Sequence, residues 1–414
     1  MSLRFAAFWL LPAAVLLAAC SESSTKTDAA VQTPTRPAVT PDSVPQGGKN
    51  PVLPKAASSP TAAVPTDTAY VQDVAAYLGA LSPSQHSSLL PLTQRPAYQA
   101  FAKDQEKSWQ KYRYTHTDRM TKWAVRELDS VQRHSPTIFY PFSGPDLLNV
   151  VTLFPSSKTY VLVGLEPVGS VPTRASLESP KLYPAVKTSL WSVLNFSFFR
   201  TNDMAVDLKS VELDGATPLI MLFAARTGHQ ILAIRPVRLS ASGQLLPADS
   251  LRTANAQLVP GAEFSLRSPN GQAKTLYYFS ADLSDSKLNV QPAALRFAES
   301  LGPLTTYVKS ATYLMHKSYF SKIRNLVLQR SNYLLQDDSG IAMKYFSRKD
   351  WQFTHYGSYR RPINLFAKHY QPELTAAYRD TVHRPQPLPF GTGYNWRQTD
   401  SNLLLAQRRV PVSN

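Results

Sequence analysis

Residues Ile138 to Gly164 carry the pattern that most restricts how this chain can fold. An apolar run ends at Phe142, a turn with Gly144 follows, and residues 147–154 have the apolar spacing of a helix. After a second turn, residues 159–165 form a short apolar run that is typical of a buried strand. A strand, a helix and a strand this close together predict a parallel unit whose helix crosses one face of the sheet.

This unit also predicts where a ligand would bind, because ligands of open parallel sheets lie beyond the carboxyl ends of the strands. Glu166 directly follows the second strand, and Asp282 follows a later predicted strand. Ser143 is expected to cap the helix, with Pro145 in its first turn. Seven residues are therefore candidates for a ligand site: Ser143, Gly144, Asp146, Glu166, Asp282, Asp337 and Asp338.

The adjacent carboxylates Asp337 and Asp338 allow two interpretations. They lie between two apolar runs in a basic segment, where they could form an acid–base or metal site. The sequence Asp-Asp-Ser-Gly is also typical of a hairpin turn, with Gly340 in the left-handed conformation. We favour the turn. We predict no metal site, because the histidines are scattered and no ligand motif occurs.

The order of elements in residues 138–166 resembles the opening of class I methyltransferases and other Rossmann-like folds. In that family a glycine-containing turn follows the first strand, and an acidic residue after the second strand holds a ribose. Gly144 and Glu166 stand in the matching places. The family's G-x-G pattern is absent, and Pro145 removes an amide that would face a ligand. The resemblance therefore implies the fold more than a cofactor site, and we predict no cofactor.

The rest of the chain predicts an α/β fold with a mixed, mostly parallel, Rossmann-like sheet. Residues 70–135 are expected to form a helical brace, and residues 136–414 an α/β domain with an irregular, basic and aromatic C-terminal part. Helices are expected at 70–81, 96–132, 188–199, 292–302, 311–316 and 320–329. Antiparallel strand pairs are expected at 217–225 with 230–237 and at 264–267 with 274–279.

The beginning of the chain predicts its location. Arg4 precedes a short apolar run, and the sequence Leu17-Ala18-Ala19-Cys20 contains the only cysteine. This pattern resembles the lipobox of exported bacterial lipoproteins, a class without a shared activity, in which the signal is cut before an acylated cysteine. The apolar run is too short to span a bilayer. We expect residues 1–19 to be a signal peptide, and Cys20 to anchor the protein in the cell envelope. Ser21 favours the outer membrane, with the domain facing the periplasm or the cell surface.

Residues 20–69 are expected to be a disordered, proline-rich stalk, because they lack aromatic side chains and their charges cancel. Because Arg4 belongs to the predicted signal peptide and the stalk is neutral, +15 of the formal net charge of +16 lies in the folded part, mostly after Ser300, where sixteen Lys and Arg face six Asp and Glu. Such an excess favours anionic partners, such as acidic glycans or anionic lipids. The same charge is also compatible with an ordinary solvated surface. No specific nucleic-acid motif is present.

The sequence leaves two functions open. The first is a binding or structural module of the envelope, which binds anionic polymers and is held by the lipid bilayer through Cys20. The second is an enzyme with a degenerate methyltransferase-like site at the strand ends. We favour the binding module, because no nucleophile elbow, phosphate loop or dinucleotide fingerprint occurs.

Overall fold

The computed structural model describes residues 67–196, 213–248 and 258–412. The predicted signal peptide, the predicted lipidation site Cys20 and nearly all of the predicted stalk lie outside these residues. The strands are β1 (Thr137–Pro141), β2 (Thr159–Gly164), β3 (Gln230–Leu239), β4 (Leu245–Pro247), β5 (Val259–Arg267), β6 (Ala273–Ser280), β7 (Leu304–Val308), β8 (Ser331–Gln336), β9 (Trp351–Gly357) and β10 (Asn402–Arg408). The α-helices are α1 (Thr68–Leu78), α2 (Leu90–Thr93), α3 (Pro96–Tyr112), α4 (Asp118–Glu127), α5 (Asp129–Arg133), α6 (Leu147–Leu153), α7 (Arg174–Glu178), α8 (Leu182–Phe196), α10 (Ala216–Arg226), α11 (Asp285–Val290), α12 (Ala293–Ser300), α13 (Ser321–Arg330) and α14 (Pro372–Tyr378).

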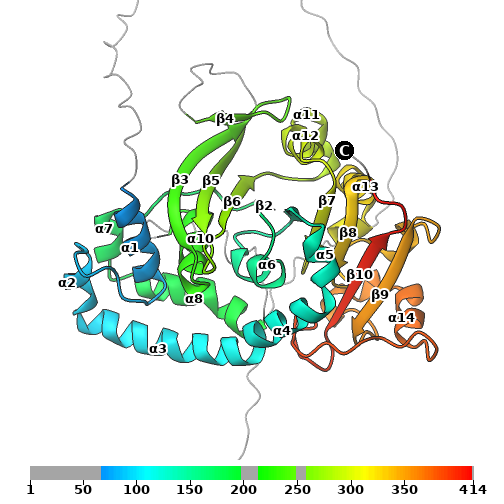
Figure 1. Cartoon of the computed structure of the whole chain (residues 1–414), viewed down its shortest axis with the longest axis horizontal. Helices are drawn as coiled ribbons and strands as arrows, with labels where there is room; N and C mark the ends of the chain where they lie inside the picture. The colour runs from blue at the N-terminus through cyan, green and yellow to red at the C-terminus, as the bar shows by residue number, and fades with distance from the viewer. Residues whose placement is uncertain (1–66, 197–212, 249–257, 413–414) are drawn as a thin grey trace, which may run out of the picture. The chain divides into compact units, whose positions relative to one another are not determined.

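The ten described strands belong to one mixed sheet with the order β4-β3-β5-β6-β2-β1-β7-β8-β10-β9 (Figure 1). The five central strands, β6-β2-β1-β7-β8, are parallel. In chain order these five strands lie third, second, first, fourth and fifth, as in a doubly wound Rossmann-like sheet. The chain reverses its direction of winding between β1 and β7, which makes the carboxyl ends of these strands the topological switch point. The predicted α/β fold is confirmed.

Antiparallel strands extend both edges of the parallel core. On one side β6 pairs with β5, which confirms the predicted hairpin, and β3 and β4 follow. On the other side β10 lies between β8 and β9 and is antiparallel to both. The C-terminal part, which the sequence predicted to be an irregular region, thus contributes two strands to the sheet.

Helices cover both faces of the sheet (Figure 1). In β2, Tyr160 and Leu162 belong to one hydrophobic cluster, together with residues of α3, α4, α6, α8 and α10. Val161 and Val163 belong to the other cluster, with residues of α11, α12 and α13. Alternate side chains of a strand point to opposite faces, so a strand that is apolar throughout requires both layers.

The N-terminal helices follow the predicted pattern. The buried face of α3 consists of Tyr98, Phe101, Gln105, Trp109 and Tyr112, which recur with the period of a helix. Between α3 and α4 the chain forms a π-helical turn, Arg113–Thr117, which the sequence did not predict. In the part of the chain that the structure describes, no helix combines the length and apolar character needed to cross a membrane.

Two predicted elements are wrong. Residues 217–225 form helix α10 rather than a strand, so the predicted antiparallel pair with β3 does not exist. The run Leu219 to Ala224 is buried on every side, and periodicity cannot separate such a helix from a buried strand. Residues 311–316 also differ from the prediction, because only a short 3-10 turn forms at Leu314–His316.

The burial of α10 can be tested by truncating one of its side chains. Ile220 is fully buried, so Ile220→Ala should lower the free energy of unfolding by about 2–5 kcal/mol through lost contacts and a residual cavity. Urea unfolding followed by circular dichroism measures this loss. Val290→Ala serves as the control, because Val290 is 63% exposed and its truncation should cost less than about 0.5 kcal/mol. Equal stability of the two variants would contradict the burial of α10.

Candidate functional site

A cavity of about 260 Å³ lies at the carboxyl ends of β1, β2, β6 and β7. We call it the strand-end cavity. Its wall combines two carboxylates, two hydroxyl groups and a set of apolar side chains. The lining residues are Phe142, Gly144, Val163, Gly164, Leu165, Glu166, Ala281, Asp282, Leu283, Ser310, Ala311, Thr312, Leu314 and Phe320. The cavity therefore occupies the switch point at which sheets of this type bind ligands.

The turn after β1 forms one side of the strand-end cavity. Phe142 and Gly144 both have left-handed backbone conformations, with φ of 61° and 55°. The Ser143 amide donates to the Val163 carbonyl at 2.9 Å, and its hydroxyl donates to the Gly144 carbonyl at 2.9 Å. Ser143 is therefore not the helix cap that the sequence predicted. Asp146 caps α6 instead, because its carboxylate accepts the Asn149 amide at 3.1 Å.

Glu166 lies at the end of β2 with only 3% of its surface exposed. The Tyr278 hydroxyl donates to the Glu166 carbonyl at 2.9 Å and to its Oε2 at 3.2 Å. Burial raises the pKa of Glu166, because the charged form loses hydration. A Cβ on Gly164 would lie 2.4 Å from Glu166 Oε2, and one on Gly144 would lie 3.3 Å from Oε1. The two glycines thus leave the space that the carboxylate fills.

The loop after β7 closes the other side of the cavity. Three of its residues that are not glycine have left-handed conformations, namely Ser310, Thr312 and Tyr313, with φ of 53°, 53° and 52°. Such backbone is costly and is frequent at ligand sites. The Ser310 hydroxyl is buried and has no hydrogen-bond partner among the described residues. Ser310 also lines the cavity, so its hydroxyl is a candidate to contact a ligand there.

Asp282 stands after β6, as the sequence predicted, and it is exposed at the cavity wall. It accepts the Ser284 amide at 2.8 Å. The structure thus brings three of the predicted site residues, Gly144, Glu166 and Asp282, to one cavity.

Asp146 lies outside the strand-end cavity and is fully buried. Lys309 Nζ, which follows β7, lies 2.9 Å from its Oδ2. The Tyr140 hydroxyl donates to the same oxygen at 2.9 Å. A buried carboxylate with an ion-pair partner and this many donors has a structural role, because breaking such a pair is strongly destabilising. Asp146 joins the ends of β1 and β7.

Asp337 and Asp338 also lie outside the strand-end cavity, and both are buried. Asp337 accepts the amides of Ser310 and Ser339. Asp338 accepts the Tyr313 hydroxyl and the Asn402 side-chain amide. These contacts connect the end of β8 to the loop after β7 and to β10.

The predicted turn at residues 337–340 forms, because the Gly340 amide donates to the Asp337 carbonyl at 3.2 Å, but the predicted hairpin does not. β8 pairs with β7 and β10, so the chain after this turn does not return along β8. Gly340 is not among the glycines with positive φ. Its Cα instead faces Gln336, where a Cβ would come within 2.4 Å of the side-chain oxygen. In the described residues no cluster of three or more His, Cys, Asp or Glu could hold a metal ion.

Ser310 and Thr312 were not predicted as site residues, because the strand before them, β7, was not predicted. The signal was present, since Leu304–Val308 is rich in β-branched and aromatic residues and follows Gly302 and Pro303. No protein-family model, curated protein or solved structure significantly resembles the chain. The chemistry of the cavity therefore has to follow from its own residues.

The buried carboxylates predict a pH dependence of stability. Burial and the charge of Asp337 raise the pKa of Asp338 to about 7. The folded state therefore holds this proton more tightly than the unfolded state. The stabilisation that comes from this tighter proton binding is complete below the ordinary pKa of about 4. It is lost as the pH rises toward about 7. The free energy of unfolding should fall across this range by up to about 1.4 kcal/mol per pH unit.

Asp338→Asn isolates this contribution, because asparagine cannot release a proton. Urea unfolding at several pH values should show a flatter pH dependence for Asp338→Asn than for the unmodified protein. Asp350→Asn, which changes an exposed carboxylate, should retain the original slope. Parallel curves for all three proteins would contradict the raised pKa.

Proposed function

We propose that the protein is an envelope-anchored lipoprotein whose α/β domain is a binding module, with the strand-end cavity as its ligand site. The observation that carries this proposal is the position of Glu166 and of the Ser310 hydroxyl, which has no partner among the described residues, in one cavity at the switch point. Cavities with an apolar wall and a few convergent polar groups are the usual form of small-molecule sites.

The lining of the strand-end cavity favours a neutral or cationic ligand with hydroxyl groups. Glu166 and Asp282 are hydrogen-bond acceptors when ionised. No lysine, arginine or histidine from the described ranges lines this cavity. Phe142, Leu314 and Phe320 supply an apolar surface for a ring. A nucleoside or a sugar has this combination of a ring and paired hydroxyl groups.

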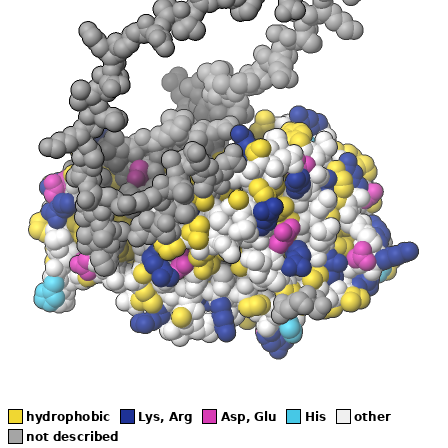
Figure 2. Space-filling model, turned by 90° about the horizontal axis from the view of Figure 1, so that it is seen from above, with side chains coloured by type: hydrophobic (Ala, Val, Ile, Leu, Met, Phe, Trp, Pro, Cys, Tyr) yellow, Lys and Arg dark blue, Asp and Glu magenta, His cyan; other side chains and the backbone are white. Residues whose placement is uncertain are grey.

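Anionic glycans or lipids, which the basic excess favours, would have to bind elsewhere. Figure 2 shows Lys and Arg scattered over the visible face, among apolar and neutral side chains, rather than gathered in one patch. We propose such polymers only as partners of the outer surface, where scattered charges give weak, salt-sensitive attraction.

An enzyme with a degenerate methyltransferase-like site is the second candidate. The order of the five parallel strands and the place of Glu166 after β2 support it. Pro145 and the missing G-x-G pattern weigh against it, as does the compartment, since S-adenosylmethionine is not normally available outside the cytoplasm. The binding module remains the preferred function.

Calorimetry on the full chain in detergent tests the proposed site. Adenosine, S-adenosylmethionine and a nicotinamide dinucleotide are titrated separately. Adenosine should bind, and Glu166→Gln should weaken it at least about tenfold, because a charge-assisted hydrogen bond is lost. Glu299→Gln, the same change at an exposed position, should leave the affinity unchanged. Absence of binding by all three ligands would refute the strand-end site.

The same experiment separates the two candidate functions. Appearance of S-adenosylhomocysteine when the protein is incubated with S-adenosylmethionine and envelope extract would support the enzyme. Binding of adenosine without turnover supports the module.

The anchor is tested through Cys20. Cys20→Ser removes the only thiol, so the protein should lose incorporation of labelled palmitate and move from the membrane to the soluble fraction. Ser21→Ala is the matched control and should keep the label. Unchanged labelling of Cys20→Ser would contradict lipidation at this residue.

A further inference from the structure

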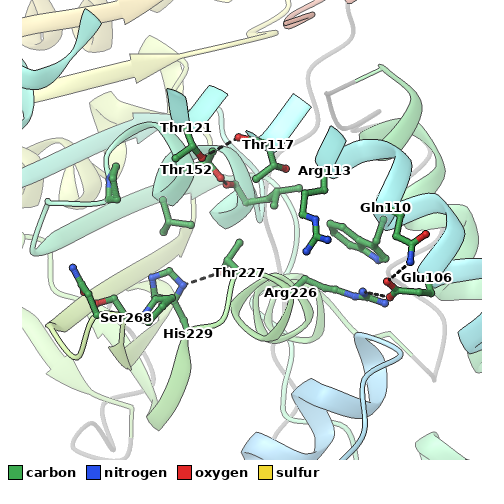
Figure 3. A pocket seen from close by; sticks show the side chains of 16 residues that line it. Glu106, Gln110, Arg113, Thr117, Thr121, Thr152, Arg226, Thr227, His229 and Ser268 are labelled. Atoms are coloured by element: carbon green, nitrogen blue, oxygen red, sulfur yellow. Dashed lines mark hydrogen bonds and ion pairs between the residues drawn. The ribbon is translucent and has the colours of Figure 1, made fainter. Parts of the chain in front are cut away.

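A second cavity, of about 460 Å³, lies at the amino-terminal ends of the parallel strands, opposite the strand-end cavity. Figure 3 shows the side chains that line it. We call it the arginine cavity. Its wall is made by α3, the π-helical turn, α4, α6, the end of α10 and the β5–β6 turn. The lining residues are Glu106, Trp109, Gln110, Arg113, Thr117, Thr121, Leu148, Val151, Thr152, Pro155, Arg226, Thr227, His229, Ser268, Pro269 and Asn270. Pro155 precedes β2 and Asn270 precedes β6, so the cavity lies at the amino-terminal ends of these strands.

Two buried donors in this wall have no acceptor in the part of the chain that the structure describes. The side chain of Arg226 is only 7% exposed. Its Nε donates to the Gly79 carbonyl, and its Nη1 lies 2.8 Å from Glu106 Oε2. Its Nη2 has no hydrogen-bond partner among the described residues, and neither has Nε1 of Trp109. Buried donors are almost always satisfied in folded proteins, so these two donors in one wall leave a place for the acceptor group of a bound molecule.

The net charge of the wall favours a ligand with one negative charge. The ionisable side chains among its lining residues are those of Glu106, Arg113, Arg226 and His229. The hydrogen bond from Arg226 holds the pKa of Glu106 below its usual value, so Glu106 is ionised. Burial lowers the pKa of His229 to about 4, so the imidazole is neutral near pH 7. Two arginines against one carboxylate leave a single positive charge.

The arrangement of the polar and apolar groups suits a small molecule with a polar end. Figure 3 shows Arg113 and Arg226 on the side of the cavity where Glu106 lies, whereas His229 and Ser268 lie on the other side. Leu148, Val151 and Pro155 provide apolar surface. The π-helical turn starts at Arg113, and such turns are frequent at functional sites.

We propose that the arginine cavity binds a small organic monoanion, a carboxylate on an aromatic or short apolar body. The carboxylate accepts hydrogen bonds from Arg226 Nη2 and Trp109 Nε1, and Arg113 at the exposed rim pairs with its charge. The body packs against the apolar side chains. A phosphate, which carries close to two negative charges, matches the single positive charge of the wall less well.

Calorimetry on the full chain in detergent tests this site with three probes of similar shape: benzoate, phenyl phosphate and benzyl alcohol. Benzoate should bind, benzyl alcohol should not, and phenyl phosphate should bind more weakly than benzoate. Arg226→Gln should weaken benzoate binding about tenfold or more, because it removes a charge-assisted hydrogen bond. Arg113→Gln tests the rim charge at an exposed position where folding is not at risk.

Lys111→Gln is the matched control, because Lys111 is exposed two residues from Arg113 and does not line the cavity. It should leave the affinity for benzoate unchanged. Absence of benzoate binding, or equal binding by the unmodified protein and both arginine variants, would overturn the proposal. Tighter binding of phenyl phosphate would overturn the choice of a carboxylate.

The two cavities are tested independently. Glu166→Gln should weaken adenosine and leave benzoate unaffected, whereas Arg113→Gln should do the reverse. Benzoate binding by a protein that fails to bind adenosine would remove the strand-end proposal and keep this one.

Discussion

The ion pair between Asp146 and Lys309 lies at the point on which the rest of the sheet depends. Both side chains are buried, and each follows one of the two central strands between which the winding reverses. Two charges in the interior are stable only when donors surround the carboxylate, and Asp146 has donors from Tyr140 and Asn149. As the cap of α6, it also faces the positive end of that helix dipole. The pair therefore fixes the ends of β1 and β7 relative to each other.

The neighbouring carboxylates extend this connection across the sheet. Ser310, next to Lys309, donates its amide to Asp337, and Asp338 accepts from Asn402 on β10. The left-handed backbone of Ser310 is thus held by its hydrogen bond to Asp337 rather than by its own preference. Because the same loop closes the strand-end cavity, the buried acids determine the shape of the site without lining it. Asp337 and Asp338, which the sequence presents as candidates for a ligand site, instead support the loop that closes the cavity.

The two cavities lie at opposite ends of the parallel strands, and the net charges of the side chains that line them are of opposite sign. Glu166 and Asp282 line one, and Arg113 and Arg226 line the other. In a parallel sheet, the loops at the carboxyl ends of the strands and those at the amino ends come from different segments of the chain. The charges of the two cavities are therefore determined by different residues. The two proposed ligands would therefore contact different residues and would not compete for one site.

The sequence by itself determined the parallel unit of β1, α6 and β2, the hairpin of β5 and β6, and the place of Glu166. Each depends on local spacing and on turns within a few residues. Only the tertiary structure decided that the buried run in α10 is helical, because an element apolar on every side has no period to distinguish it. Only the tertiary structure placed Asp337 and Asp338 in the interior and joined Arg113 to Arg226 in one wall. Those contacts connect residues far apart in the chain. The removal from water that makes the interactions of buried charges strong exists only after folding.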